Sequence, residues 1–333
     1  MRAAVIGAGS FGTALSFVLG SKGIQVQLWA REEPVCRGIN ETHRNPHYLS
    51  DARLPDSVRA TASLEEALSG AELVVAATPS QVAREVFTRA LPYVPRDVPV
   101  VTASKGIEEG TLRTPTEVLE DVLPPHFHPY LAVLSGPSFA KEIVQGAPTA
   151  VTVAANWIRV AEQVQEAFSA PTFRCYTSHD VIGVQVGAAL KNVIAIGSGI
   201  VDGLGFGHNA RAALITRGLA EMTRIAVALG GNPITLAGLS GLGDLVLTCT
   251  GELSRNRTVG VELGRGRKLA EILESLGQVA EGVKTARSAL ALARKVGVDA
   301  PLTEQVHAIL HEGKDPHRTA VELMTRVPKP EFR

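Results

Sequence analysis

The first residues whose types and spacing suggest chemistry form a glycine-rich turn near the start of the chain. Gly7, Gly9 and Gly12 occupy the glycine positions of a GxGxxG pattern that follows an apolar run and precedes a helical one. In such a turn the first glycine permits the tight bend, the second lets the backbone approach a pyrophosphate, and the third lets helix and strand pack closely. Amides at the helix N-terminus would bind the anion. The pattern predicts a dinucleotide site, against the alternative of an ordinary glycine-rich turn.

The end of the second apolar run bears on which dinucleotide would bind. An NAD-selective site places an acidic residue there to bind the ribose 2′-hydroxyl, whereas this chain has Ala30 and Arg31. Arg31 could pair with a 2′-phosphate, so the sequence favours NADP(H). NAD(H) remains an alternative because Glu32 and Glu33 follow immediately. A solvated loop arginine with no ligand is the other alternative.

Lys191 is the only charge in an apolar stretch of 21 residues, 181–201. A lysine at the centre of a bilayer costs about 2.5 to 3.5 kcal/mol on insertion scales, and the chain has neither a second span nor an aromatic belt. We therefore expect a helix buried in the protein and no integral membrane segment. Burial lowers the pKa of a lysine, which would let Lys191 donate or accept a proton near neutral pH. The alternative is a lysine that pairs with a buried carboxylate only for packing.

Two further groups of polar residues follow apolar runs in the first half. Lys105 lies in Ser104-Lys105-Gly106, where its ammonium would lie beside the cofactor. Gly136 would permit close approach of a ligand, and Ser138 would supply a hydroxyl and a helix N-cap. Ligands of an open α/β sheet bind beyond the carboxyl ends of the strands, where both groups fall.

The second half of the chain contributes a carboxylate, Asp244, and a helix whose first turn contains the basic residue Arg255. Asp244 follows two glycines and could accept hydrogen bonds from Lys191 or from a substrate hydroxyl. Ser254 suits an N-cap position, which places Arg255 and Asn256 in the first helical turn. An arginine there is unfavourable to the helix dipole unless an anion compensates it, so this start favours a phosphate.

Other chemistries find little support. Cys36, Cys175 and Cys249 are far apart and have no CxxC spacing, so we expect neither disulfides nor a metal site, and a reducing cytoplasm. His307 and His311 lack the glutamate of an HExxH motif. The segment around Ser138 is not a GxSxG elbow, so a serine hydrolase gains no support.

Composition bounds the remaining choices. The chain has 333 residues, enough for two domains, and 33 basic residues cancel 33 acidic ones. No overall field therefore exists to hold nucleic acid or an anionic membrane, and we expect no nucleic-acid partner. Any anionic ligand must be held by local charge.

The hydrophobic pattern divides the chain into two parts. Apolar runs alternate with helical stretches in the first part, which predicts repeated βαβ units and a mostly parallel sheet. The predicted strands are Ala3 to Ile6, Ile24 to Trp29, Val58 to Thr61, Glu72 to Ala77, Pro99 to Ala103, Tyr130 to Leu134 and Thr149 to Ala154. A polar insertion, Arg31 to Ser57, reads as surface loop or short helix.

After about His179 only helical patterns remain. The predicted helices are Val181 to Val201, Ala210 to Leu229, Arg255 to Leu263, Gly282 to Val296 and Leu302 to His311. We predict an α/β protein: a Rossmann-type, doubly wound sheet domain over residues 1–179, and an all-helical domain for substrate and catalysis over residues 180–333.

With these residues assembled, the chain resembles the bacterial NAD(P)-dependent glycerol-3-phosphate dehydrogenases. The resemblance runs from Val5 to about Ala286 in the blocks GAGSFGTAL, SKGIE, LSGPSFAKE, ALKNVIAIGSGI, GLSGLGDLVLTC, SRNR and EGVKTA. It implies reversible reduction of dihydroxyacetone phosphate to sn-glycerol 3-phosphate, a precursor of glycerophospholipids. It also implies that Lys191 is the catalytic acid/base, with Asp244 and Lys105 orienting the reacting end of the substrate.

The same resemblance assigns contacts residue by residue. The implied substrate contacts are Lys105, Gly136, Ser138, Lys191, Asp244, Ser254, Arg255 and Asn256. The implied cofactor contacts are Ser10, Phe11, Arg31, Lys105, Ala140, Arg255, Val279 and Glu281.

Two alternatives stay open at this point. Dehydrogenases of the 6-phosphogluconate or β-hydroxyacid type also join a Rossmann domain to a helical one and use a lysine on a long helix, although Ser254-Arg255-Asn256 and the GLGD block favour a three-carbon phosphate. A non-catalytic nucleotide-binding protein would have no need of Lys191 and Asp244. The oligomeric state is open as well, and a homodimer is one expectation.

Overall fold

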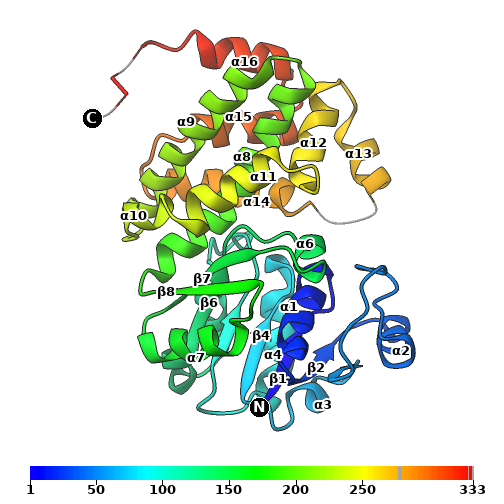
Figure 1. Cartoon of the computed structure of the whole chain (residues 1–333). Helices are drawn as coiled ribbons and strands as arrows, with labels where there is room; N and C mark the ends of the chain where they lie inside the picture. Colours follow the sequence, from blue (N-terminus) through cyan, green and yellow to red (C-terminus); the bar gives the residue numbers. More distant parts are fainter. Residues whose placement is uncertain (277–279, 329, 332–333) are drawn as a thin grey trace.

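The computed structural model describes residues 1–276, 280–328 and 330–331. Its sheet part and helical part lie one above the other in Figure 1, with the N-terminus in the sheet part. Val279, one of the expected cofactor contacts, lies outside the described residues.

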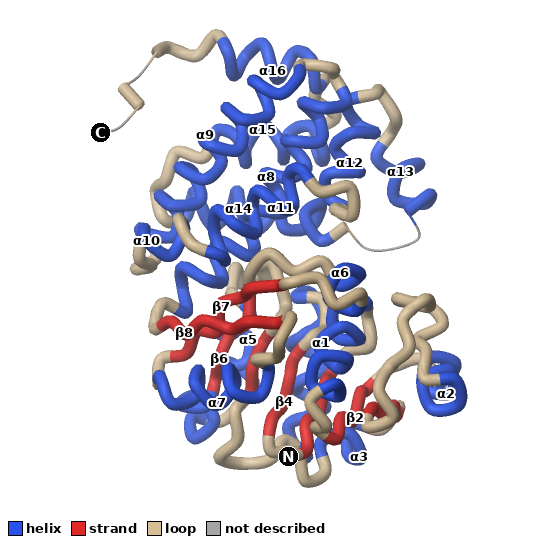
Figure 2. The backbone as a smooth tube through the Cα atoms, viewed as in Figure 1, coloured by secondary structure: helices blue, strands red, loops and turns tan. Residues whose placement is uncertain are grey.

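Eight strands form one sheet in the order β3-β2-β1-β4-β5-β6-β7-β8. β7 is antiparallel to β6 and every other pair is parallel, which confirms the predicted, mostly parallel sheet (Figure 2). The strands are β1 (Arg2–Ile6), β2 (Gln25–Trp29), β3 (Val58–Thr61), β4 (Leu73–Ala76), β5 (Val100–Thr102), β6 (Leu131–Ser135), β7 (Thr149–Ala155) and β8 (Phe173–Ser178).

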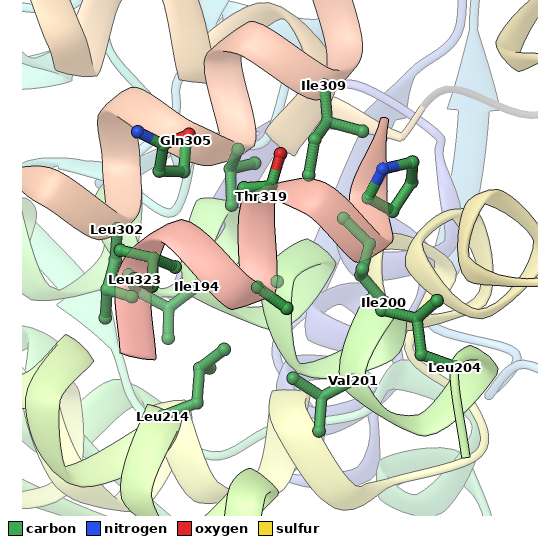
Figure 3. A pocket seen from close by; sticks show the side chains of 14 residues that line it. Ile194, Ile200, Val201, Leu204, Leu214, Leu302, Gln305, Ile309, Thr319 and Leu323 are labelled. Atoms are coloured by element: carbon green, nitrogen blue, oxygen red, sulfur yellow. The ribbon is translucent and has the colours of Figure 1, made fainter. Parts of the chain in front are cut away.

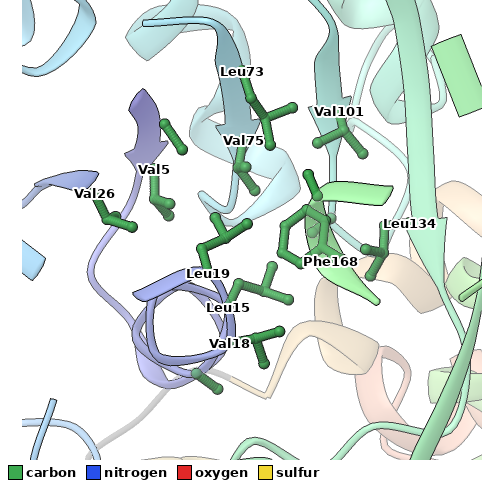
Figure 4. Packing of buried hydrophobic residues seen from close by; sticks show 14 of the residues in the cluster. Val5, Leu15, Val18, Leu19, Val26, Leu73, Val75, Val101, Leu134 and Phe168 are labelled. Carbon is green, nitrogen blue, oxygen red and sulfur yellow. The ribbon is translucent and has the colours of Figure 1, made fainter. Parts of the chain in front are cut away.

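Helices cover both faces of the sheet because residues of each central strand alternate between two apolar clusters. Val5 packs with Leu15, Val18 and Phe168 on one face (Figure 4), and Ile6 packs with Phe87 on the other. The helices of this part are α1 (Ser10–Ser21), α2 (Glu33–Thr42), α3 (Leu64–Leu68), α4 (Ala83–Ala90), α5 (Pro115–Val122), α6 (Ala140–Val144) and α7 (Ile158–Phe168).

Two features of this part differ from expectation. β8 was not among the predicted strands. It pairs with β7 at the edge of the sheet, and its side chains alternate between buried Phe173 and Cys175 and exposed Arg174 and Tyr176, unlike the interior strands β4 and β6, whose residues are all buried. The insertion Arg31 to Ser57 does contain a helix, α2, but it is more than surface loop because its Ile39 and Leu54 are fully buried.

The second part is entirely helical, as predicted. Its helices are α8 (Val181–Gly203), α9 (Gly207–Ala228), α10 (Pro233–Leu236), α11 (Asp244–Thr250), α12 (Arg255–Gly264), α13 (Leu269–Leu276), α14 (Glu281–Lys295), α15 (Pro301–His311) and α16 (Pro316–Met324). A π-helical turn, Leu239–Gly243, precedes α11. The short helices α10, α11, α13 and α16 were not predicted.

Helix α8 lies at the centre of this part, and its backbone packs directly against the backbone of α12. A Cβ on Gly199 would lie 2.1 Å from the carbonyl oxygen of Arg257, and one on Gly260 would lie 2.0 Å from that of Ile196. The glycines of α8 therefore serve helix packing. By length and composition two stretches of the described residues could span a membrane, 181–203 and 233–250, and the second was not expected from the sequence. The apolar window of α8 is 89% buried inside the protein, as in a core helix, and that of the second stretch is 39% buried.

A small apolar cavity of about 50 Å³ lies behind α8, among α9, α15 and α16. Ile194, Ile200 and Val201 of α8 face Leu302 and Ile309 of α15 across it (Figure 3). Its lining includes none of Lys105, Lys191 or Asp244, so the cavity is separate from the candidate site.

Candidate functional site

The glycine-rich turn joins β1 to α1 in the geometry that the sequence predicts. Gly7 has a φ of +121°, and a Cβ there would lie 2.7 Å from the carbonyl oxygen of Ala77. A Cβ on Gly12 would lie 1.9 Å from the carbonyl oxygen of Gly7. A Cβ on Gly9, by contrast, would meet nothing within 4 Å. Packing within the protein thus explains why positions 7 and 12 are glycines, whereas the space that a side chain of residue 9 would occupy is open.

The same turn offers an uncapped helix N-terminus. Gly9 is the N-cap of α1, no side chain caps the helix, and its first turn has no acidic residue. Free amides at the start of a helix attract anions. The open space at Gly9 together with these amides fits a pyrophosphate.

Lys105, Asp244 and Lys191 join the two parts of the molecule. Lys105 follows β5, Lys191 lies on α8, and Asp244 begins α11. The Lys191 Nζ donates to Oδ1 of Asp244 at 2.5 Å, and the Lys105 Nζ donates to Oδ2 at 2.9 Å. One carboxylate therefore holds two ammonium groups, and its side chain is only 1% exposed.

Burial shifts the protonation equilibrium of Lys191. Loss of water around its amine lowers the pKa to about 8, and the positive charge of Lys105 acts in the same direction. The negative charge of Asp244 opposes the shift. Lys191 can therefore exchange a proton near neutral pH, which few lysines can do.

Lys105 also links this ion pair to the glycine-rich turn. Its Nζ lies 5.3 Å from the centre of the Phe11 ring, within cation–π range, and 3.4 Å from the carbonyl oxygen of Gly136. Gly136 has a φ of +150°, and a Cβ there would crowd β7, 2.9 Å from the Cα of Val151. The polar residues after β5 and β6 thus lie together, as expected of neighbouring strand ends.

Ser138 is buried at this place but does not cap a helix. Its hydroxyl donates to the carbonyl oxygen of Gly136 at 2.8 Å. The N-cap of α6 is Phe139, and no side chain caps that helix. The expected N-cap at Ser138 is wrong because the helix starts one residue too late for it, at Ala140.

The basic helix start is built as predicted. The Ser254 hydroxyl accepts a hydrogen bond from the Arg257 N–H at 3.2 Å and so caps α12. Arg255 and Asn256 occupy the first turn, and Oδ1 of Asn256 accepts from the Gly282 N–H at 3.0 Å. This bond ties the start of α12 to the start of α14.

Glu281, the first residue of α14, brings an acid to the same region. Burial raises its pKa to about 7, while the positive charges of Arg255, Lys105 and Lys191 act to lower it. These three cations are therefore close enough to Glu281 to act on its carboxyl group. Glu281 lies beside the start of α12, because its neighbour Gly282 donates to Asn256.

Arg31, by contrast, lies at the surface of the molecule. Its side chain is 79% exposed and pairs with Oε1 of Glu32 at 2.9 Å. It lies just beyond the end of β2, whose last residue Trp29 accepts a hydrogen bond from the Gly7 N–H at 3.1 Å. Arg31 is thus two residues from the strand end that contacts the glycine-rich turn.

The structure adds residues that the sequence analysis missed. Lys191 also donates to the hydroxyl of Thr248 at 2.9 Å. Thr248 is one helical turn after Asp244, a spacing that puts both on one face of α11, so this partner could have been found. Asn45 of the insertion contacts the glycine-rich turn at Ala8 and Thr13, and no local pattern indicates that.

These observations define a class of protein: a dinucleotide-binding sheet domain joined to a helical domain through a buried lysine-carboxylate pair, the arrangement of a dehydrogenase. Family models of the N-terminal and C-terminal parts of NAD-dependent glycerol-3-phosphate dehydrogenase match residues 2–161 and 180–321. The chain belongs to this family.

Individual relatives agree over the whole length. The chain is 62% identical over 332 residues to a glycerol-3-phosphate dehydrogenase [NAD(P)+] of Myxococcus xanthus, covering 100% of this chain and 99% of that one. It is 56% identical to one of Anaeromyxobacter over 100% of both chains. Among solved structures it is similar to a glycerol-3-phosphate dehydrogenase of Coxiella burnetii, with a TM-score of 0.92, 40% identity and coverage of 98% and 99%. Neither matched family model describes the 6-phosphogluconate or β-hydroxyacid type.

Proposed function

We propose that this chain catalyses the reversible reduction of dihydroxyacetone phosphate to sn-glycerol 3-phosphate with a nicotinamide cofactor, and so supplies glycerophospholipid synthesis. The observation that carries the proposal is the buried amine of Lys191 on Asp244, which Lys105 also contacts. Membership of the glycerol-3-phosphate dehydrogenase family supports it over the 6-phosphogluconate or β-hydroxyacid type and over a non-catalytic nucleotide-binding protein.

The sheet part holds the cofactor in this proposal. Backbone amides at the start of α1 donate hydrogen bonds to the pyrophosphate, which lies in the open space at Gly9. When bound, the nicotinamide supplies a hydride to the ketone carbon. The further cofactor contacts that we propose are Gly7, Ser10, Phe11, Gly12, Arg31, Lys105, Ala140, Arg255, Val279 and Glu281.

Lys191 moves the proton. In the reductive direction its ammonium donates a proton to the developing alkoxide of the substrate, and in the oxidative direction the neutral amine takes the proton of the hydroxyl. A pKa of about 8 makes both forms accessible near neutral pH. Asp244 fixes the amine, and Lys105 with Asp244 orients the reacting end of the substrate.

The start of α12 binds the substrate phosphate. Arg255 offers a charged fork, and Asn256 and the free amides of the first turn lie beside it. Ser254 holds this turn in place, and Gly136 and Ser138 contact the rest of the substrate. A phosphate also compensates the unfavourable position of Arg255 in the helix dipole.

A substrate panel tests the proposal. The purified chain is supplied with NADPH and dihydroxyacetone phosphate, and in reverse with NADP+ and either sn-glycerol 3-phosphate or 6-phosphogluconate. We expect turnover with the three-carbon phosphates and none with 6-phosphogluconate. Turnover with 6-phosphogluconate alone would favour the other dehydrogenase type, and binding of NADPH without any turnover would favour the non-catalytic alternative.

Several finer expectations belong to the same proposal. We favour NADP(H) over NAD(H) because no acidic residue ends β2. A homodimer is one expectation for the assembly, and sedimentation measures it. The boundary at 179/180 is testable by limited proteolysis. The burial of α8 supports a protein without an integral membrane segment. The free, buried cysteines 36, 175 and 249 support the reducing cytoplasm.

A further inference from the structure

Asn45 lies in the insertion between β2 and β3 and is fully buried. Its Nδ2 donates to the carbonyl oxygen of Ala8 at 2.8 Å and to the hydroxyl of Thr13 at 2.9 Å. Its Oδ1 accepts from the backbone N–H groups of His47 and Tyr48, both at 3.1 Å. All the hydrogen-bonding capacity of this amide is thus used between the insertion and the glycine-rich turn.

The bond to Ala8 fixes the peptide unit that matters most in that turn. Ala8 stands between Gly7 and Gly9, and in a trans peptide the C=O and the following N–H point in opposite directions. When the Ala8 carbonyl points to Asn45, the Gly9 N–H therefore points away from it. Among the hydrogen bonds of the described residues, none is donated by that N–H, so it remains available to an anion.

Buried side chains and a backbone hydrogen bond fix the position of the insertion that contains Asn45. Ile39 and Leu54, on either side of it in sequence, are fully buried in the apolar cluster that also contains Leu15 of α1. The Leu54 N–H donates to the carbonyl oxygen of His43 at 2.7 Å. The anchor of the turn is therefore part of the core of the sheet domain.

We infer that Asn45 is a positioning residue for the dinucleotide: it holds the Ala8 carbonyl so that the Gly9 amide is oriented toward the pyrophosphate before the cofactor arrives. A site oriented in advance loses less free energy on binding. The inference rests on the proposed function and assigns to the insertion a role in the cofactor affinity of that site.

Asn40 provides a control for the loss of an amide donor at an exposed position, whereas Asn45 is fully buried. It lies in the same insertion, and its side chain also bridges backbone groups, with Nδ2 donating to the Ala60 carbonyl and Oδ1 accepting from the Ala60 N–H, both at 2.8 Å. Ala60 belongs to β3 at the edge of the sheet, away from the glycine-rich turn. Asn45→Asp loses the Nδ2 that donates to the Ala8 carbonyl and to the Thr13 hydroxyl, and Asn40→Asp loses the Nδ2 that donates to the Ala60 carbonyl. Each variant keeps an acceptor.

The experiment measures the Kd of NADPH by its fluorescence, and kcat and KM for dihydroxyacetone phosphate at saturating NADPH. We expect Asn45→Asp to raise the Kd of NADPH roughly tenfold or more, with kcat and the substrate KM within about twofold of the wild type. Asn40→Asp should leave the Kd within about twofold. Equal Kd values for the two variants, or a loss of kcat and melting temperature without a change in Kd, would overturn the inference.

An uncharged pair covers the case in which Asn45→Asp does not fold. The Thr13 hydroxyl accepts from Asn45 and itself donates to the Ala8 carbonyl oxygen at 3.4 Å. Thr13→Ser keeps this hydroxyl, and Thr13→Val removes it while keeping the shape. We expect weaker NADPH binding in Thr13→Val and wild-type binding in Thr13→Ser, and equal binding in both would contradict the inference. A wild-type chain that binds no NADPH would overturn the proposed function itself.

Discussion

At the scale of residues, one buried carboxylate organises the site. Asp244 contacts Lys191 and Lys105, and Thr248 completes the environment of the Lys191 amine. Removing a buried charge from such a set leaves its partners without compensation. Because the Lys191 amine donates and accepts the proton in the proposed reaction, the pH dependence of kcat should follow the protonation of Lys191.

Reduction and oxidation should respond to pH in opposite ways. The ammonium form of Lys191 drives reduction, so kcat for dihydroxyacetone phosphate should fall as pH rises through about 8. The neutral amine drives oxidation, so kcat for sn-glycerol 3-phosphate should rise over the same range. Steady-state pH profiles in both directions check this, and parallel profiles would contradict the role of Lys191.

Arg31 decides cofactor preference in this account. Arg31→Glu should raise the Kd of NADPH roughly tenfold and leave that of NADH nearly unchanged, because only NADPH carries the 2′-phosphate. Arg53→Glu is the control: Arg53 lies in the same insertion, is 58% exposed and pairs with Asp56. Fluorescence titration of both cofactors measures the effect, and unchanged selectivity would remove the assignment.

Arg255 should act mainly on substrate binding. Arg255→Ala should raise the KM for dihydroxyacetone phosphate roughly tenfold or more, with a smaller loss of kcat. Arg265→Ala, at the other end of α12 and 63% exposed, should change neither. An effect confined to kcat would argue against a phosphate contact.

At the scale of elements, the close packing of α8 on α12 holds Lys191 and Arg255 in one site. Gly199→Ala would drive a Cβ to 2.1 Å from the Arg257 carbonyl oxygen and should lower the free energy of unfolding by about 1 to 3 kcal/mol. Gly197→Ala, two residues earlier, meets side chains and no backbone: Val306 at 3.2 Å and Leu214 at 3.5 Å, beside the cavity. Its effect should stay below about 1 kcal/mol, as urea unfolding can measure, and equal losses would contradict the packing argument.

Apolar strands and long, regularly patterned helices were predictable, and the short helices and the edge strand β8 were not. The strands from β1 to β7 read as apolar runs, and α8 as a long apolar helix. β8 escaped notice because an edge strand alternates with solvent. The antiparallel direction of β7 has no local signature, since the pairing partner decides it.

The residues of the site also divide into those that the sequence indicates and those that it does not. Lys105, Lys191, Asp244 and Ser254 stand out because a charge in an apolar stretch or a cap before a helix is visible in sequence. Asn45 and the bond between Asn256 and Gly282 depend on which distant backbone comes near. Contacts of that kind become apparent only in the folded structure.

At the scale of the whole molecule, a net charge of zero conceals a cationic site. Equal numbers of acidic and basic residues cancel over the chain, yet Lys105, Lys191 and Arg255 all act on the carboxyl group of Glu281. The two parts of the chain share the work: the sheet part binds the dinucleotide, and the helical part supplies the proton and the phosphate contact.

This division makes Lys191→Ala the most direct test of the account. Asp244 has Lys105 as a second partner at 2.9 Å, and the substitution does not touch the glycine-rich turn, so the fold and NADPH binding should persist. Turnover of dihydroxyacetone phosphate with NADPH should fall by about 10² to 10⁴-fold, with the NADPH Kd within about threefold of the wild type. Turnover near the wild-type rate would contradict the assignment of Lys191 as the acid/base.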